Sequence, residues 1–282
     1  MLDNKTILIT GGTGTIGEHL ILKILSAHNP KIIRIYSRDD TKQYYLSKKL
    51  EKFESKLRFF IGDVRDKERL SRAIKDVDVI FHLAALKHVV ACEYNPFEAI
   101  KTNIIGLQNL IELSIDHNIE RFIYTSTDKA ASPSNTMGVT KLLGEKLVTA
   151  ANFYKGNAKT IFYSVRFGNV LGSRGSLIPL IEEQVKNNIP ITITHNEMTR
   201  YIMSIEKAIQ LILGTLEVAQ GGEVFVLKMD CVKIVDLIQV LIENFAMKYD
   251  QKEEKIKKKE IGMFAGEKLY EELFSIEESI RT

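Results

Sequence analysis

The sequence has few cysteines and few histidines. Its 282 residues include two cysteines, Cys92 and Cys231, whose separation matches no metal-ligand spacing, and six histidines that do not cluster. We therefore predict no metal site and no disulfide framework. Such sparing use of cysteine is typical of a reduced compartment, so we expect a cytoplasmic protein.

The sequence also has no long apolar run and no strong net charge, and we expect no leader peptide. No apolar run approaches the roughly 18–20 residues of a membrane span. Met1 is followed closely by a strand-like segment, Thr6–Thr10, without the basic and then apolar residues of a secretion signal. The net charge of +3 is nearly balanced, and the lysines are scattered. We therefore expect neither a membrane nor a nucleic acid as a partner.

Short apolar runs alternate with charged segments of helical period. This rhythm predicts an α/β protein with a Rossmann-type, doubly wound parallel sheet that helices cover on both faces. The expected strands are residues 6–10, 32–36, 57–61, 77–83, 121–124, 160–166 and 223–227. Residues 1–166 should form a nucleotide-binding domain, to which residues 205–227 return, and residues 167–204 and 228–282 a smaller C-terminal lobe that binds substrate.

A glycine-rich turn joins the first strand to the first helix. Gly11, Gly14 and Gly17 follow a GxxGxxG spacing within TGGTGTIG. Such a turn allows a pyrophosphate to approach the free N–H groups at a helix N-terminus. A glycine turn without a ligand is the alternative, which the amphipathic helix after it disfavours. The turn predicts a dinucleotide site that also includes Thr13, Thr15 and Ile16.

The end of the second strand bears on the choice of cofactor. Ser37 and Arg38 come first, Lys42 follows about one helical turn later, and these residue types favour the 2′-phosphate of NADP. Asp39 leaves NAD open, because an acid at this strand end can bind the ribose 2′-hydroxyl. After the third strand, Asp63 and Val64 are expected near the adenine, although Asp63 could instead cap the next helix.

Three further segments, taken together with the glycine loop, resemble one family. They are AALKHV (84–89) with CEYNPFEA (92–99), STDKA (126–130) before MGVTK (137–141), and RFGNVLGSRGS (166–176). In this order they resemble the extended short-chain dehydrogenase/reductases. More narrowly, they are similar to the UDP-N-acetylglucosamine 4,6-dehydratases of polysaccharide, flagellin-glycan and pseudaminic-acid synthesis.

The resemblance implies a reaction and roles for its residues. Members of that family use bound NADP to oxidise C4 of the sugar, remove the proton at C5 and expel the C6 hydroxyl. Asp128 then matches the acid at O6 and Lys129 the base at C5. Thr127 matches the hydroxyl that contacts O4, and Lys141 the lysine that holds the nicotinamide ribose.

Other positions match the family's binding residues. The resemblance implies cofactor contacts at Leu83, Ala84, Ala85, Lys87, Thr102, Asn103 and Val170. It implies contacts to UDP-GlcNAc, or a close UDP-sugar, at Lys87, Asn169, Arg174, Gly175, Ser176, Leu177 and Arg200. Family members also assemble as dimers or hexamers, so we expect a homo-oligomer, with the helices near residues 97–118 and 135–152 as candidates for its interface.

Two departures from the family pattern keep alternatives open. Met137 stands where many members have tyrosine, and a thioether cannot accept the proton of the C4 hydroxyl. Lys141, Thr127 acting through water, or Asp128 could accept it instead. Phe264 stands where the family usually has an arginine before GEK (266–268), which leaves an altered sugar nucleotide or product as an alternative.

These departures leave four outcomes. The leading hypothesis is a lyase that gives a 4-keto-6-deoxy sugar, with C5 inverted in the most similar members. The same elimination could instead return the hydride to C4 and give a 5,6-ene. A C4 epimerase would have no use for the acid–base pair Asp128–Lys129, and an NADP-binding protein without catalysis is the remaining alternative.

Overall fold

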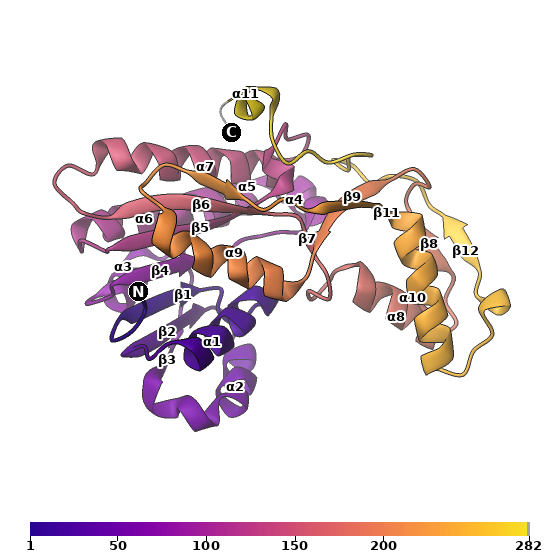
Figure 1. Cartoon of the computed structure of the whole chain (residues 1–282), viewed down its shortest axis with the longest axis horizontal. Coiled ribbons are helices and arrows are strands. Elements are labelled where there is room, and N and C mark those ends of the chain that lie inside the picture. Colours follow the sequence, from indigo (N-terminus) through magenta and orange to yellow (C-terminus); the bar gives the residue numbers. More distant parts are fainter. Residues whose placement is uncertain (281–282) are drawn as a thin grey trace.

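A parallel sheet of seven strands forms the centre of the molecule (Figure 1). The computed structural model describes residues 1–280. The strand order is β10-β6-β5-β4-β1-β2-β3, which confirms the predicted α/β fold. The strands are β1 (Thr6–Thr10), β2 (Ile32–Ser37), β3 (Leu57–Ile61), β4 (Val79–His82), β5 (Arg121–Thr127), β6 (Ile161–Phe167) and β10 (Val224–Val226).

Helices cover both faces of this sheet because two separate apolar clusters need burial. One cluster packs α1, α2 and α9 on one face, and the other packs α3, α6 and α7 on the opposite face. The bounds are α1 (Thr15–Ala27), α2 (Asp40–Lys49), α3 (Lys67–Ile74), α6 (Gly106–Asp116), α7 (Thr136–Tyr154) and α9 (Ile205–Val218).

The helix expected near residues 97–118 is interrupted. Its segment contains α5 (Pro96–Ile100), a π-helical turn at Lys101–Ile105 and then α6, and the short α4 (Val89–Tyr94) precedes it. A π turn holds one more residue than an α turn, so it changes which side chains face the sheet. Thr102 and Asn103 lie in this turn and are both buried.

A smaller lobe lies beside the sheet and has its own apolar core, built from Ile181, Ile191 and Ile238 among others. Figure 1 shows it on the right. Its elements are β7 (Asn169–Val170), α8 (Leu177–Lys186), β8 (Ile191–Ile193), β9 (Thr199–Met203), β11 (Asp230–Lys233), α10 (Ile234–Lys248) and β12 (Lys258–Glu260).

The last described segment leaves this lobe and returns to the sheet. It ends in α11 (Ile276–Ser279), where Glu278 pairs with Arg166 of β6. The domain limits expected at residues 166, 204 and 227 stay a prediction. Within residues 1–280, no helix combines the length and apolarity that crossing a membrane requires.

Candidate active site

The glycine-rich loop brings two backbone segments into close contact. Gly11 has φ +70°, and a Cβ there would lie 2.8 Å from the amide nitrogen of Ala84. A Cβ on Gly17 would lie 2.5 Å from Gly12 Cα. Gly14, the N-cap of α1, has no side chain that could cap the first N–H groups of the helix, and Gly14, Thr15 and Ile16 line the cavity in front of it. This is a geometry suited to a phosphate.

A cavity of about 900 Å³ opens over the carboxyl ends of the strands. Most of the predicted site residues line it. Of those predicted to contact the cofactor, they are Gly11, Thr13, Gly14, Thr15, Ile16, Ser37, Arg38, Lys42, Asp63, Val64, Leu83, Ala84, Ala85, Lys87, Thr102, Lys141 and Val170. Of those predicted to contact the substrate, they are Lys87, Asn169, Arg174, Gly175, Ser176 and Leu177, and Thr127, Lys129 and Met137 line the same cavity.

At the end of β2, the Asp39 carboxylate is already paired with Lys42. The carboxylate accepts the Lys42 N–H at 2.8 Å and lies 2.6 Å from Lys42 Nζ, and these contacts hold the pKa of Asp39 below its usual value. Arg38 is about half exposed, with Nη1 3.5 Å from Asp63 Oδ2. The cap of α3 is Asp66, so Asp63 does not cap that helix.

Asp128 and Lys129 form a short turn directly after β5. Asp128 Oδ1 accepts hydrogen bonds from Thr127 Oγ1 at 2.8 Å and from Lys129 Nζ at 2.9 Å. Lys129 Nζ also donates to Asn169 Oδ1 at 3.1 Å. Asp128 is fully buried and does not line the cavity, and its Oδ2 has no hydrogen-bond partner among residues 1–280. Its carboxylate therefore reaches the cavity through Thr127 and Lys129.

Lys141 and Met137 lie on α7, one turn apart. Lys141 Nζ donates to the Thr125 carbonyl at 2.8 Å and lies 4.7 Å from the centre of the Tyr124 ring. Burial lowers the pKa of Lys141 to about 8, so the amine becomes neutral, and able to accept a proton, near that pH. Met137 is buried in an apolar cluster with Cys92 and offers no group for proton transfer.

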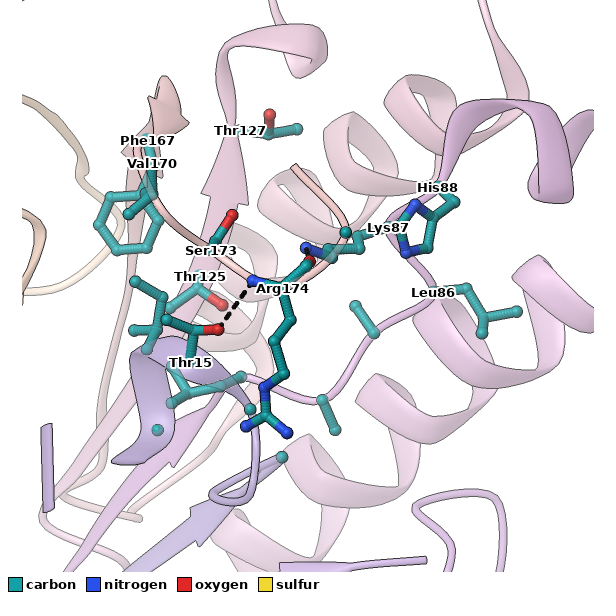
Figure 2. Close-up of a pocket in the computed structure, with 18 of the residues that line it drawn as sticks. Thr15, Leu86, Lys87, His88, Thr125, Thr127, Phe167, Val170, Ser173 and Arg174 are labelled. Carbon is teal, nitrogen blue, oxygen red and sulfur yellow. Dashed lines mark hydrogen bonds between the residues drawn. The ribbon is translucent and has the colours of Figure 1, made fainter. Parts of the chain in front are cut away.

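The loop after β7 folds onto the glycine-rich loop. The Arg174 N–H donates to Thr15 Oγ1 at 3.1 Å (Figure 2). The Arg174 guanidinium donates to the Thr13 carbonyl. Lys87 Nζ donates to the Arg174 carbonyl at 2.7 Å. Arg174, which the resemblance predicts as a substrate contact, thus also contacts the glycine-rich loop.

Comparison with known proteins assigns the family. The model of the polysaccharide biosynthesis protein family matches residues 7–282. The chain belongs to this family. This confirms the relationship expected from the motifs of the glycine loop, STDKA and GNVLGSRGS.

Several known proteins are similar to almost the whole chain. A protein described as an uncharacterized membrane protein of Methanocaldococcus jannaschii is 57% identical over 98% of this chain and 82% of its own length. The UDP-N-acetylglucosamine 4,6-dehydratase (inverting) of Campylobacter jejuni is 43% identical over 99% of this chain and 80% of its own. The X-ray structure of Pen from Bacillus thuringiensis covers 99% of this chain and 85% of its own, with TM-score 0.96 and 44% identity.

Three of the residues predicted for the site in this chain do not line the cavity. Asp128 is described above. Asn103 accepts the Leu86 N–H at 2.8 Å and donates to the Leu86 carbonyl at 3.1 Å, so it fixes the loop after β4. Arg200 is buried and donates to the carbonyls of Thr199 at 2.7 Å and Leu269 at 3.3 Å.

One buried residue near Asp128 and Lys129 is not predicted from the sequence as a site residue. Glu271 Oε1 lies 3.6 Å from Lys129 Nζ, and its side chain is 2% exposed. It comes from the segment after β12, far from Lys129 in the sequence. No local pattern around LYEEL distinguishes this glutamate from a surface residue.

Proposed function

We propose that this protein is a nucleotide-sugar dehydratase that acts on UDP-GlcNAc with bound NADP and gives a 4-keto-6-deoxy sugar, with C5 inverted as the leading outcome. The observation that carries the proposal is the Thr127–Asp128–Lys129 cluster at the cavity, held by Asn169. A base and an acid side by side are what loss of a proton from C5 and of the hydroxyl from C6 require. The name of the C. jejuni relative supports the same substrate and reaction.

The cavity fits a nicotinamide dinucleotide. The glycine loop and the α1 N-terminus would hold its pyrophosphate, and Lys141, which also lines the cavity, would hold the nicotinamide ribose. When bound, the nicotinamide supplies reversible oxidation at C4. We favour NADP over NAD because Arg38 is half exposed at the cavity while the Asp39 carboxylate is already paired with Lys42.

Arg38→Ala should weaken NADP+ binding about 10- to 100-fold, because a charge-assisted hydrogen bond to the 2′-phosphate is worth about 1.5–3 kcal/mol. NAD+ binding should stay within about twofold. Calorimetric titration of the purified protein with each cofactor measures both values. Arg72→Ala, an exposed arginine of α3 paired with Glu68, is the control and should change neither. Equal losses for the two cofactors would contradict the assignment of Arg38.

Protons can move through the cluster without a tyrosine. Thr127 Oγ1 already donates to Asp128 Oδ1, so Thr127 can take the C4 hydroxyl proton while it passes its own to Asp128. Asp128 then supplies, through the Thr127 hydroxyl, the proton with which O6 leaves as water. Lys129 accepts the C5 proton and returns one to C5. Lys141, with its lowered pKa, is the second candidate for the C4 proton.

Incubation of the protein with UDP-GlcNAc in deuterated water, followed by NMR, tests the function. The expected product has lost the C6 oxygen, carries a C4 ketone and contains deuterium at C5. A vinyl signal would mean that the 5,6-ene forms. A product that keeps O6 and differs only at C4 would indicate an epimerase. Unchanged substrate in the presence of bound NADP would overturn catalysis altogether.

The assembly and its location stay predictions. Exposed apolar side chains on α4, α5 and α7, namely Val90, Tyr94, Phe97, Val139 and Leu143, support a homo-oligomer, a dimer or a hexamer. We retain the expectation of a cytoplasmic protein without a nucleic-acid or membrane partner.

A further inference from the structure

Lys129 lies between two buried carboxylates. Asp128 Oδ1, from the same turn, is 2.9 Å from Lys129 Nζ, and Glu271 Oε1 approaches from another segment at 3.6 Å. The Glu271 side chain is 2% exposed. Its second oxygen, Oε2, has no hydrogen-bond partner in the part of the chain that the structure describes. Burying an ionised carboxylate costs free energy unless a charged partner compensates it. Lys129 is a cation within ion-pair distance of Glu271.

The segment around Glu271 is held on both sides. Before it, the Leu269 carbonyl accepts the Thr199 N–H at 3.1 Å. After it, the Leu273 carbonyl accepts from Arg166 Nη1 at 2.6 Å, and Glu278 accepts from Arg166 at 2.8 and 3.0 Å. Arg166 itself is fully buried. These anchors fix the backbone, so the position of the Glu271 carboxylate is determined by the fold.

Four charged groups face Glu271. They are Lys129 and Asp128 from the turn after β5, Arg200 from β9 and Lys268 from its own segment. Burial and the Asp128 carboxylate raise the pKa of Glu271 above its usual value, although Lys129, Arg200 and Lys268 act in the opposite direction. The three cations offset part of this burial cost, and Lys129 is the one that lies within ion-pair distance of the carboxylate.

We propose that Glu271 is a positioning residue for Lys129, whose carboxylate holds the lysine amine in place and stabilises the ammonium ion that forms when Lys129 takes up a proton. The segment after β12 would therefore complete the active site. The inference rests on the proposed function in that the proton comes from C5 of the sugar. The ion pair itself rests on the geometry alone.

The proposal predicts two effects of Glu271→Gln, which removes the charge and keeps the shape. The acid limb of the kcat profile moves to lower pH, by about one pH unit or more, because a nearby carboxylate favours the ammonium form and a neutral amide does not. The maximal kcat falls about 10- to 100-fold, the range expected for losing a charge-assisted contact. KM stays within about twofold, because Glu271 does not line the cavity.

The ion pair can be measured without turnover. Competitive acetylation of the intact protein by acetic anhydride, read by mass spectrometry over a range of pH, reports when the Lys129 amine becomes nucleophilic. In Glu271→Gln the pH of half-maximal labelling at Lys129 should be lower than in the wild type. Glu271→Asp keeps the charge but moves it farther from Lys129, so the pH of half-maximal labelling should fall by less. This variant replaces Glu271→Gln in the experiment if the glutamine variant folds poorly.

Glu272→Gln is the matched control, since Glu272 is the exposed neighbour in the same segment. It should leave the labelling of Lys129 and the kcat profile unchanged. An identical labelling curve for Lys129 in wild type, Glu271→Gln and Glu271→Asp would overturn the proposal. A shifted labelling curve in a protein that leaves UDP-GlcNAc untouched would instead support the ion pair and overturn the proposed function.

Discussion

Lys129→Met is expected to lower kcat on UDP-GlcNAc by about 10²–10⁴-fold, the usual cost of removing a general base. Methionine fills a similar volume but cannot accept the C5 proton. Incorporation of deuterium at C5, followed by NMR in deuterated water, should fall by the same factor. NADP+ binding should change little, because Lys129 pairs with Asp128 and Asn169 and not with the glycine loop.

The control for this prediction is Lys23→Met, on the exposed side of α1, which should keep full turnover. Full C5 exchange by Lys129→Met would show that another group removes this proton. The assignment of Lys129 would then fail even if the product were the expected one.

Arg166→Leu is expected to lower the free energy of unfolding by about 3–5 kcal/mol, as when one partner of a buried ion pair is removed. Arg166 Nη2 lies 2.7 Å from Glu145 Oε2, and the two side chains are 1% and 3% exposed. Leucine would leave the Glu145 carboxylate buried without this cation. It would also remove the hydrogen bonds from Arg166 to Glu278 and to the Leu273 carbonyl. Urea denaturation followed by circular dichroism measures the loss.

Two comparisons make this prediction specific. The double variant Arg166→Leu/Glu145→Leu should recover much of the stability, because no unpaired buried charge remains. Arg72→Leu breaks an exposed pair with Glu68, whose side chains are 68% and 82% exposed, and should cost less than about 1 kcal/mol. An equal loss for Arg166→Leu and Arg72→Leu would mean that Arg166 does not anchor the last segment.

The sequence predicts the central sheet well because parallel strands are buried on both faces and appear as apolar runs. The limits of β1 and β3 agree with the structure, whereas β5 continues beyond the expected Tyr124 to Thr127. Those added residues are polar, so they end the apolar pattern, although they still pair with β6 as far as Thr127 and Phe167. The end of the strand that carries the candidate chemistry is therefore the part that hydrophobicity misses.

Local order in the sequence explains which site residues could be found. Asp128 and Lys129 are adjacent, and their motif places them at the end of β5. Glu271 contacts Lys129 only after the whole chain has folded, and a glutamate in LYEEL carries no mark of burial. At Asn103 the motif predicts a cofactor contact but does not predict where the side chain points. In the structure its amide forms hydrogen bonds with the backbone of Leu86.

The anchoring of the last segment has a consequence for the order of folding. Arg166 and Glu278 are 112 residues apart, and Lys129 and Asn169 are 40 apart. Such distant contacts cost loop-closure entropy before they contribute stability, so they form late compared with the local helices. The environment of Lys129 should thus be organised after most of the secondary structure, and a refolding chain would regain its helices before Lys129 is in place.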